Sequence, residues 1–193
     1  MKMKLLPKKH IDPNEKGKRI ALTAVLCVLL SLLYAVIFSF SDQDAEESSS
    51  LSLEVTEKCV ETITELSGQK VDDSLKHQLA LQFEKPVRKL AHFTEYAIMG
   101  ALVSGLLAVW FKAGKGRFLC NIGWVSVSAA FDEFHQRFVA GRFGSPMDVL
   151  LDTAGGLFGI LAAYLAGRLV AAVLSKWFGR AENKADARNF FVS

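Results

Sequence analysis

An unbroken apolar run near the start of the chain constrains the fold more than any other feature. Residues 20–40, IALTAVLCVLLSLLYAVIFSF, carry no charged side chain over 21 positions. A helix that rises 1.5 Å per residue needs roughly 20 residues to cross about 30 Å of hydrocarbon. The run is longer than the apolar core of a secretory signal, and SDQDAEE follows it in place of a small-residue cleavage site. It therefore predicts a membrane span that is not cleaved.

The rest of the chain is also unusually apolar. Of its 193 residues, 51% are hydrophobic, and the mean hydropathy of +0.25 is high for a soluble domain. Three further segments, 90–111, 118–138 and 148–167, are apolar with polar residues at one end. We therefore expect an all-α integral membrane bundle of four transmembrane helices.

The distribution of basic residues predicts the orientation of these spans. Of the 23 Lys and Arg residues, seven lie in residues 1–19, three in the turn 112–117, and five after residue 167. Basic residues are retained on the cytoplasmic side of a membrane. We expect a basic cytoplasmic head (1–19), a cytoplasmic tail (167–193) and an outer loop (41–89). The net charge of +3 gives no support for nucleic-acid binding.

The outer loop is predicted to contain amphipathic, extracytoplasmic helices. Gly68 is expected to end the first helix, and residues 71–83 to form a second. Pro86, which a first helical turn tolerates, places the start of the second span near Val87. Packing on the bundle is expected for the first helix rather than contact with the membrane, because its other face is acidic. Its apolar stripe is Leu51, Val55, Cys59, Ile63 and Leu66.

The chain has three cysteines, Cys27, Cys59 and Cys120, of which only Cys59 falls in the outer loop. This number and placement do not make a disulfide framework. We expect buried or packing thiols.

Polar residues gather at the outward ends of the last three spans. These ends read RKLAHFTEY, FDEFHQR and DVLLD, and helical spacing places most of the polar residues of each on one stripe of its helix. They are Arg88, His92 and Glu95 in the second span, Asp132, Glu133 and Gln136 in the third, and Asp148 and Asp152 in the fourth.

Glycines continue the stripe of Asp148 and Asp152 along the fourth span. Gly155 and Gly159 would let another helix approach closely, so the two carboxylates should point into the bundle. An Asp or Arg at the centre of an isolated span costs about 2.5–3.5 kcal/mol on insertion scales. The clustered polar groups should therefore pair with one another or line a wet cavity. The same glycine pair could serve self-association, so the sequence leaves the oligomeric state open.

Segments that carry these residues resemble the VanZ family of small bacterial membrane proteins. They are FSFSDQ, RKLAHFTEYAIMGALV and AAFDEFHQRFVAGRFGSPMDVLLDTAGGLFG, and the resemblance covers roughly residues 20–166. Family members are associated with low-level resistance to teicoplanin, a lipid-bearing glycopeptide antibiotic that acts at the outer face of the cytoplasmic membrane. The resemblance implies a bacterial cell-envelope protein, and it implies no settled reaction. The matching residues are Arg88, His92, Glu95, Asp132, Glu133, Gln136, Arg142, Asp148, Asp152 and Gly156.

The polar residues allow a structural and a binding interpretation. The structural one is an ion-pair network that locks the helices together. The other is an outward-facing pocket lined by the nine polar residues of that set. In it Arg88 and Arg142, with Arg137 as a further candidate, would bind an anionic head group such as phosphate, while apolar helix faces hold an acyl chain. Membrane lipid, a lipoglycopeptide or an envelope precursor would be the partner.

Catalysis is a third interpretation, as a hydrolase or transferase acting on envelope lipids. His92, Glu95, Asp132, Glu133 and Asp152 are the residue types that act as general acids and bases. Two histidines with carboxylates could also hold a divalent metal. Because the sequence shows no nucleophile motif, phosphate loop or recognised metal-ligand spacing, it assigns no metal and no cofactor. His135 lies off the stripe and is expected at the aqueous rim. Transport ranks last, since no inverted repeat is visible.

Overall fold

Every regular element in the described part of the chain is a helix. The structure, a computed structural model, describes residues 13–68 and 72–190, with side chains through Trp177. Part of the predicted head (1–12) and the last residues of the predicted tail (191–193) lie outside this description. Within it the helices are α1 (Pro13–Ser41), α2 (Ala45–Ser67), α3 (Asp73–Trp110), α4 (Lys115–Gln136) and α5 (Pro146–Phe190).

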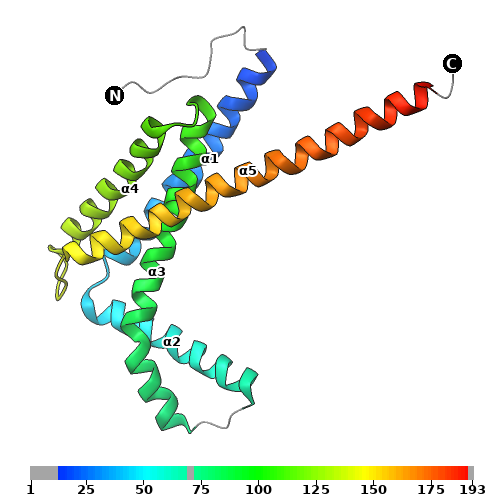
Figure 1. The fold of residues 1–193 in the computed structure, drawn as a ribbon. Coiled ribbons are helices and arrows are strands. Elements are labelled where there is room, and N and C mark those ends of the chain that lie inside the picture. Colours follow the sequence, from blue (N-terminus) through cyan, green and yellow to red (C-terminus); the bar gives the residue numbers. More distant parts are fainter. Residues whose placement is uncertain (1–12, 69–71, 191–193) are drawn as a thin grey trace.

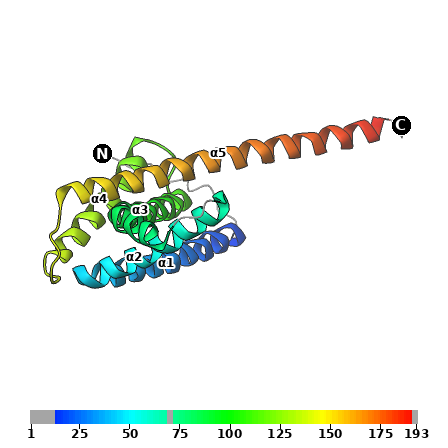
Figure 2. The same ribbon diagram turned by 90° about the horizontal axis from the view of Figure 1, so that it is seen from below.

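The helices form a bundle with two distinct ends (Figure 1). The start of α1 and the turn between α3 and α4 lie at one end, and the end of α1, the end of α4 and the start of α5 lie at the other. Helix α2 packs on the first half of α3, and α5 packs on α3 and α4 before it runs beyond the bundle (Figure 2). This arrangement brings the polar termini of separate helices together.

Three helices in the described residues are long and apolar enough to cross a membrane. They are α1, α3 and residues Pro146–Trp177 of α5. Helix α4 has 22 residues, close to the predicted 118–138, but Asn121, Asp132 and Glu133 lower its hydropathy. The structure thus supports three of the four predicted spans. Helix α5 continues to Phe190, past the predicted boundary at residue 167.

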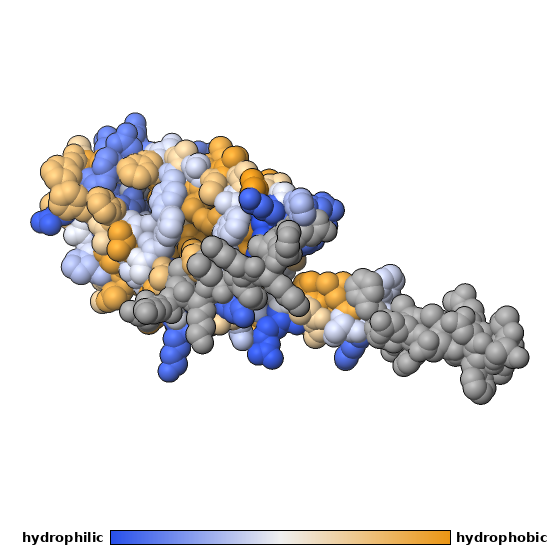
Figure 3. All heavy atoms as spheres, turned by 90° about the horizontal axis from the view of Figure 1, so that it is seen from above, coloured by the Kyte–Doolittle hydropathy of each residue, from blue (hydrophilic) through white to orange (hydrophobic). Residues whose placement is uncertain are grey.

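Many apolar side chains are exposed on the outer surface of this bundle, and Figure 3 shows orange areas among hydrophilic ones on one face. On α1 alone, Ile20, Leu22, Val25 and Val28 are each at least half exposed. A helix whose exposed positions are apolar as well as its buried ones is typical of a membrane span. The buried core is small by comparison, with Leu30 and Ile37 of α1 packed against Tyr96, Met99, Val103, Val125, Ala129 and Ile160.

The prediction that a helix begins near Val87 is wrong. Helix α3 starts at Asp73 and runs through Pro86 without a break, so the described part of the predicted second helix, residues 72–83, is not a separate helix. Proline removes one helical hydrogen bond and ordinarily breaks or kinks a helix. Here α2 packs along the first half of α3, where Ala80 and Glu84, one helical turn apart, are buried. We attribute the continuity of α3 to this packing.

The prediction for α2 is right about the helix and wrong about its buried face. The helix ends before Gly68, whose φ of 67° lies in the left-handed region that suits glycine. However, the apolar stripe is on the outside, with Leu66 84% exposed and Ile63 64% exposed. The residues that α2 buries are small and polar, among them Ser48 and Thr56.

The expectation of buried cysteines is also wrong, since Cys27, Cys59 and Cys120 are all free and exposed. Cys27 and Cys120 lie on the apolar helices α1 and α4. A thiol behaves as a small hydrophobe and is compatible with a lipid-facing as well as a protein-facing position.

Glycines on α5 allow its close approach to α3 and α4. A Cβ atom on Gly155 would lie 2.3 Å from the carbonyl oxygen of Phe93, and one on Gly159 would lie 1.8 Å from that of Ala97. A Cβ atom on Gly156 would lie 2.2 Å from Cγ1 of Val125 on α4. Only a residue without a side chain permits such contacts, so these glycines fix where Asp152, one turn earlier, enters the bundle.

Candidate functional site

The nine polar residues that the sequence singled out lie at the end of the bundle where α1 and α4 finish and α5 begins. Helix α3 passes this end at its midpoint, because its first half extends beyond the bundle (Figure 1). We call this group the polar cluster. Its members are Arg88, His92, Glu95, Asp132, Glu133, Gln136, Arg142, Asp148 and Asp152.

Asp132 connects α4 to the end of α1. The Ser41 hydroxyl donates a hydrogen bond to Oδ1 of Asp132. Nε2 of Gln136 donates to Ser41 Oγ at 2.8 Å and to Oδ2 of Asp132 at 3.5 Å. All three residues are buried, and buried polar groups need such partners. Ser41 lies within the FSFSDQ segment, but no sequence pattern distinguishes it.

Glu133 holds the turn that leads into α5. Its Oε2 accepts a hydrogen bond of 2.7 Å from the backbone N–H of Ser145. The same turn approaches the end of α4 so closely that a Cβ atom on Gly144 would lie 2.2 Å from the carbonyl oxygen of Glu133. Glu133 thus has a structural partner that the sequence pattern did not show.

Arg142 caps the last turn of α1. Its guanidinium donates to the carbonyl oxygens of Phe40 (3.4 Å) and Ser41 (3.2 Å) and to Ser48 Oγ on α2 (2.6 Å). A cation is favourable at the negative end of a helix dipole. Burial lowers the pKa of Arg142, and the nearby positive charge of Arg88 lowers this pKa further. Two guanidinium groups therefore share one region of the cluster.

The remaining charges at the rim are partly paired. Nζ of Lys89 lies 2.5 Å from Oδ1 of Asp148, which joins α3 to the first turn of α5. NH1 of Arg88 lies 3.8 Å from Oε1 of Glu84. Asp148 was expected to point into the bundle, but its side chain is 31% exposed and its charge is balanced by a lysine.

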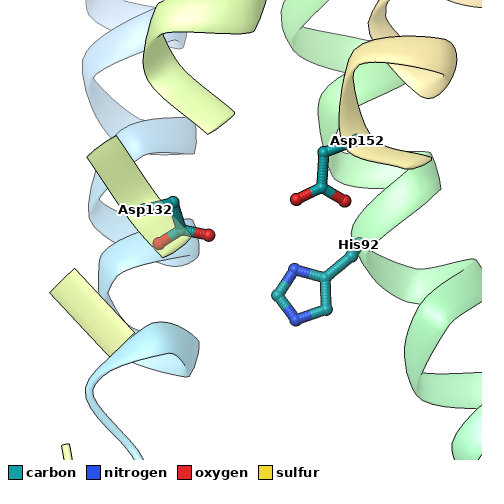
Figure 4. Close-up of side chains that lie close together, drawn as sticks. All are labelled: His92, Asp132 and Asp152. Carbon is teal, nitrogen blue, oxygen red and sulfur yellow. The ribbon is translucent and has the colours of Figure 1, made fainter. Parts of the chain in front are cut away.

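Asp152, which is buried, and His92, which is partly buried, have buried side-chain atoms without hydrogen-bond partners in the described residues. Neither carboxylate oxygen of Asp152 has a hydrogen-bond partner within the described part of the chain, and the same holds for Nδ1 of His92. Nδ1 of His92 lies 3.8 Å from Oε2 of Glu95, too far for a hydrogen bond. One ligand atom each from His92, Asp132 and Asp152 lies within 4.8 Å of the other two (Figure 4).

Two cavities open beside these residues and share Arg88, His92 and Arg142 in their walls. The first, of about 200 Å³, is the polar cavity in the sense that most of its lining side chains are polar or charged, and they include Lys89, Glu133, Gln136, Asp148 and Asp152. The second, of about 170 Å³, is mainly apolar and is also lined by Phe40, Leu51, Val55, Val87 and Ala91.

Two residues considered in the sequence lie outside these cavities. Arg137 is exposed and lines neither of them. His135 is partly exposed, with Nε2 3.4 Å from Oδ1 of Asp42 and its ring against that of Phe38. The structure therefore separates both residues from the other candidates.

The described residues define an all-helical protein with three helices able by length and composition to cross a membrane. Residues 26–167 match the VanZ/LLP1 family, and the chain belongs to this family. The match confirms the resemblance seen in the sequence, and it contains every member of the polar cluster. Neither a curated protein nor a solved structure matches the chain.

Proposed function

We propose that this protein spans the bacterial cytoplasmic membrane and binds an anionic, lipid-bearing ligand of the cell envelope at its outer face. The observation that carries the proposal is the pair of adjoining cavities, one polar and one apolar, that share Arg88, His92 and Arg142. A ligand with a charged head group and an acyl chain would place the head group in the polar cavity and the acyl chain in the apolar one.

The charges around the shared wall favour an anion. No carboxylate oxygen in the described residues lies within 4.0 Å of the Arg142 guanidinium, and the carboxylate nearest to Arg88 is 3.8 Å away. Guanidinium groups bind phosphate and carboxylate with paired, charge-assisted hydrogen bonds. An anionic head group would relieve the repulsion between the two arginines.

The apolar cavity suits the lipid part of the ligand. It lies between α2, the end of α1 and the middle of α3, and Leu51 and Val55 of the exposed α2 stripe form part of its wall. This explains why the first half of that stripe is not buried against the bundle. We expect an acyl chain to occupy the cavity with its head group toward Arg142.

In the proposed membrane arrangement α4 crosses the membrane in addition to α1, α3 and α5. Both termini then lie in the cytoplasm. Helix α4 packs on α3 and α5, both of which are long and apolar enough to span. Basic residues lie at the bundle end where α3 turns into α4, namely Lys112, Lys115 and Arg117. By the distribution of basic residues this end is cytoplasmic, and the polar cluster faces outward.

Binding can be tested with the full chain in nanodiscs and phosphatidic acid as the anionic probe. Replacing Arg142 by Gln removes a charged donor, and we expect binding to weaken about tenfold or more, since such hydrogen bonds contribute about 1.5–3 kcal/mol. Arg137→Gln is the matched control, because this arginine lines neither cavity. Equal affinity of the two variants, or equal binding of a zwitterionic lipid, would refute the proposal.

A contribution to glycopeptide resistance is tested separately in cells. Expression in a teicoplanin-sensitive bacterium should raise the inhibitory concentration of teicoplanin, and a glycopeptide without an acyl chain should show no such shift. Arg142→Gln should lose the effect at equal membrane abundance. An unchanged susceptibility with protein present in the membrane would exclude the resistance role and leave the binding result unaffected.

A membrane-embedded hydrolase or transferase is the second candidate function. It is favoured by Nδ1 of His92 and the carboxylate oxygens of Asp152, which have no hydrogen-bond partner in the described residues; both side chains are suited to proton transfer and line the polar cavity. Mass spectrometry of the probe lipid after incubation with the protein tests this candidate. Recovery of the lipid unchanged, under conditions where it binds, would eliminate it.

A further inference from the structure

We propose that His92, Asp132 and Asp152 bind one divalent transition-metal ion. The three side chains come from α3, α4 and α5, and each offers a ligand atom within 4.8 Å of the other two. Figure 4 shows the imidazole and the two carboxylates directed into the space between the helices. No local sequence spacing could reveal the set, because it is assembled from three separate helices.

Unpartnered lone pairs converge on this space. Asp152 is 1% exposed, yet neither of its carboxylate oxygens accepts a hydrogen bond from any described residue, and Nδ1 of His92 also has no partner there. Native structures seldom leave a buried carboxylate in this condition, and buried charges are either paired or coordinate metal ions. A metal ion would satisfy both residues at once.

Nearby basic side chains do not neutralise the two aspartates. In the described residues no lysine or arginine nitrogen lies within 4.0 Å of a carboxylate oxygen of Asp132 or Asp152. Lys89 is paired with Asp148, and Arg142 donates to the end of α1 and to Ser48. Asp132 accepts hydrogen bonds from Ser41 and Gln136, which are uncharged. Neither aspartate therefore forms an ion pair with a basic side chain in the described residues.

The donor set selects the class of metal. Carboxylates alone suit Mg²⁺ or Ca²⁺, whereas an imidazole together with carboxylates suits Zn²⁺, Mn²⁺ or Fe²⁺. Such ions hold their ligands at about 2.0–2.2 Å, which places tetrahedral donor atoms about 3.3 Å apart. The ligand atoms, which lie within 4.8 Å of one another, would therefore each have to come about 1–2 Å closer together when an ion binds. His92 and Asp152 also line the polar cavity, so a remaining coordination position would face it.

The test uses the untagged full chain, purified in detergent and treated with chelator, because an affinity tag would itself bind metal. Zn²⁺ and Mn²⁺ are titrated separately, and bound metal is measured by elemental mass spectrometry after desalting. We expect about one equivalent per chain and a thermal midpoint that rises with metal concentration, because the ion binds only the folded state. Mg²⁺ should give neither effect at the same concentration.

Asp152→Asn tests the assignment, and Asp148→Asn, one helical turn earlier on α5, is its matched control. Asp152→Asn should bind metal at least about tenfold more weakly, the loss typical of disturbing a metal site. Without metal it should melt no lower than the wild type, because the Asp152 carboxyl group accepts no hydrogen bond in the described residues that the substitution could break. Asp148→Asn should keep the metal response. The absence of stoichiometric metal in the wild type, or equal binding by the two variants, would overturn the proposal whether or not a lipid binds.

Discussion

Gly159 lies where the backbones of α5 and α3 come closest. A methyl group there would be 1.8 Å from the carbonyl oxygen of Ala97, while a Cβ atom on Gly167, two turns further along α5, meets nothing within 4 Å. The same substitution should therefore have opposite effects at the two positions.

Gly159→Ala should lower the free energy of unfolding by about 1–3 kcal/mol, the usual cost of overpacking. Gly167→Ala should be neutral or stabilising by up to about 1 kcal/mol, because alanine favours a helix over glycine. Thermal unfolding of both variants in detergent measures the difference. A Gly159→Ala protein as stable as the wild type would show that α5 does not pack as closely as described.

At the residue scale, the sequence could indicate which polar residues share a bundle end, because charged groups in apolar helices are conspicuous and helical spacing assigns their faces. It could not separate their roles. Asp148 and Asp152 follow the same pattern, yet Lys89 pairs with only one of them. Ser41 is essential to the surroundings of Asp132, but a serine at the end of an apolar run gives no distinctive signal.

At the scale of elements, α3 shows tertiary packing overriding a local helix breaker. Pro86 lies in its interior, while Pro146 is the first residue of α5, where a helix tolerates proline. Local reasoning assigned Pro86, too, to a first turn. For Pro86 the assignment failed because the turns before it are stabilised by packing against α2. A short stretch of sequence around Pro86 does not show this tertiary contact.

Pro86→Ala should therefore restore a hydrogen bond within α3 and raise the free energy of unfolding by up to about 3 kcal/mol. Pro146→Ala should change it by no more than about 0.5 kcal/mol. Differential scanning calorimetry of the two variants compares them directly. Equal, negligible effects would instead indicate that a helix begins at Pro86.

The same scale explains the error in the face of α2. Hydrophobic periodicity shows which residues form one stripe, but not which environment covers that stripe. In a membrane protein, lipid or a bound ligand can take the place of the core, so Leu51 and Val55 line a cavity and Ile63 and Leu66 stay outside. Small residues such as Thr56 form the helix contact.

For the whole molecule, the account depends on one geometric arrangement. The ends of α1 and α4, the start of α5 and the middle of α3 meet, and the turn between α3 and α4 lies at the opposite end (Figure 1). Both the anion proposal and the metal proposal need this arrangement, since their residues come from α3, α4, α5 and the turn before α5. Membrane sidedness is the property of the whole chain that tests it.

Single cysteines in a chain with Cys27, Cys59 and Cys120 replaced by serine provide that measurement. Lys89→Cys and Phe143→Cys probe the polar end, and Lys115→Cys probes the other end; all three positions are exposed. In intact protoplasts, a membrane-impermeant maleimide should label positions 89 and 143, and it should label position 115 only after permeabilisation. Labelling of positions 89 and 143 from opposite sides of the membrane would contradict a shared site.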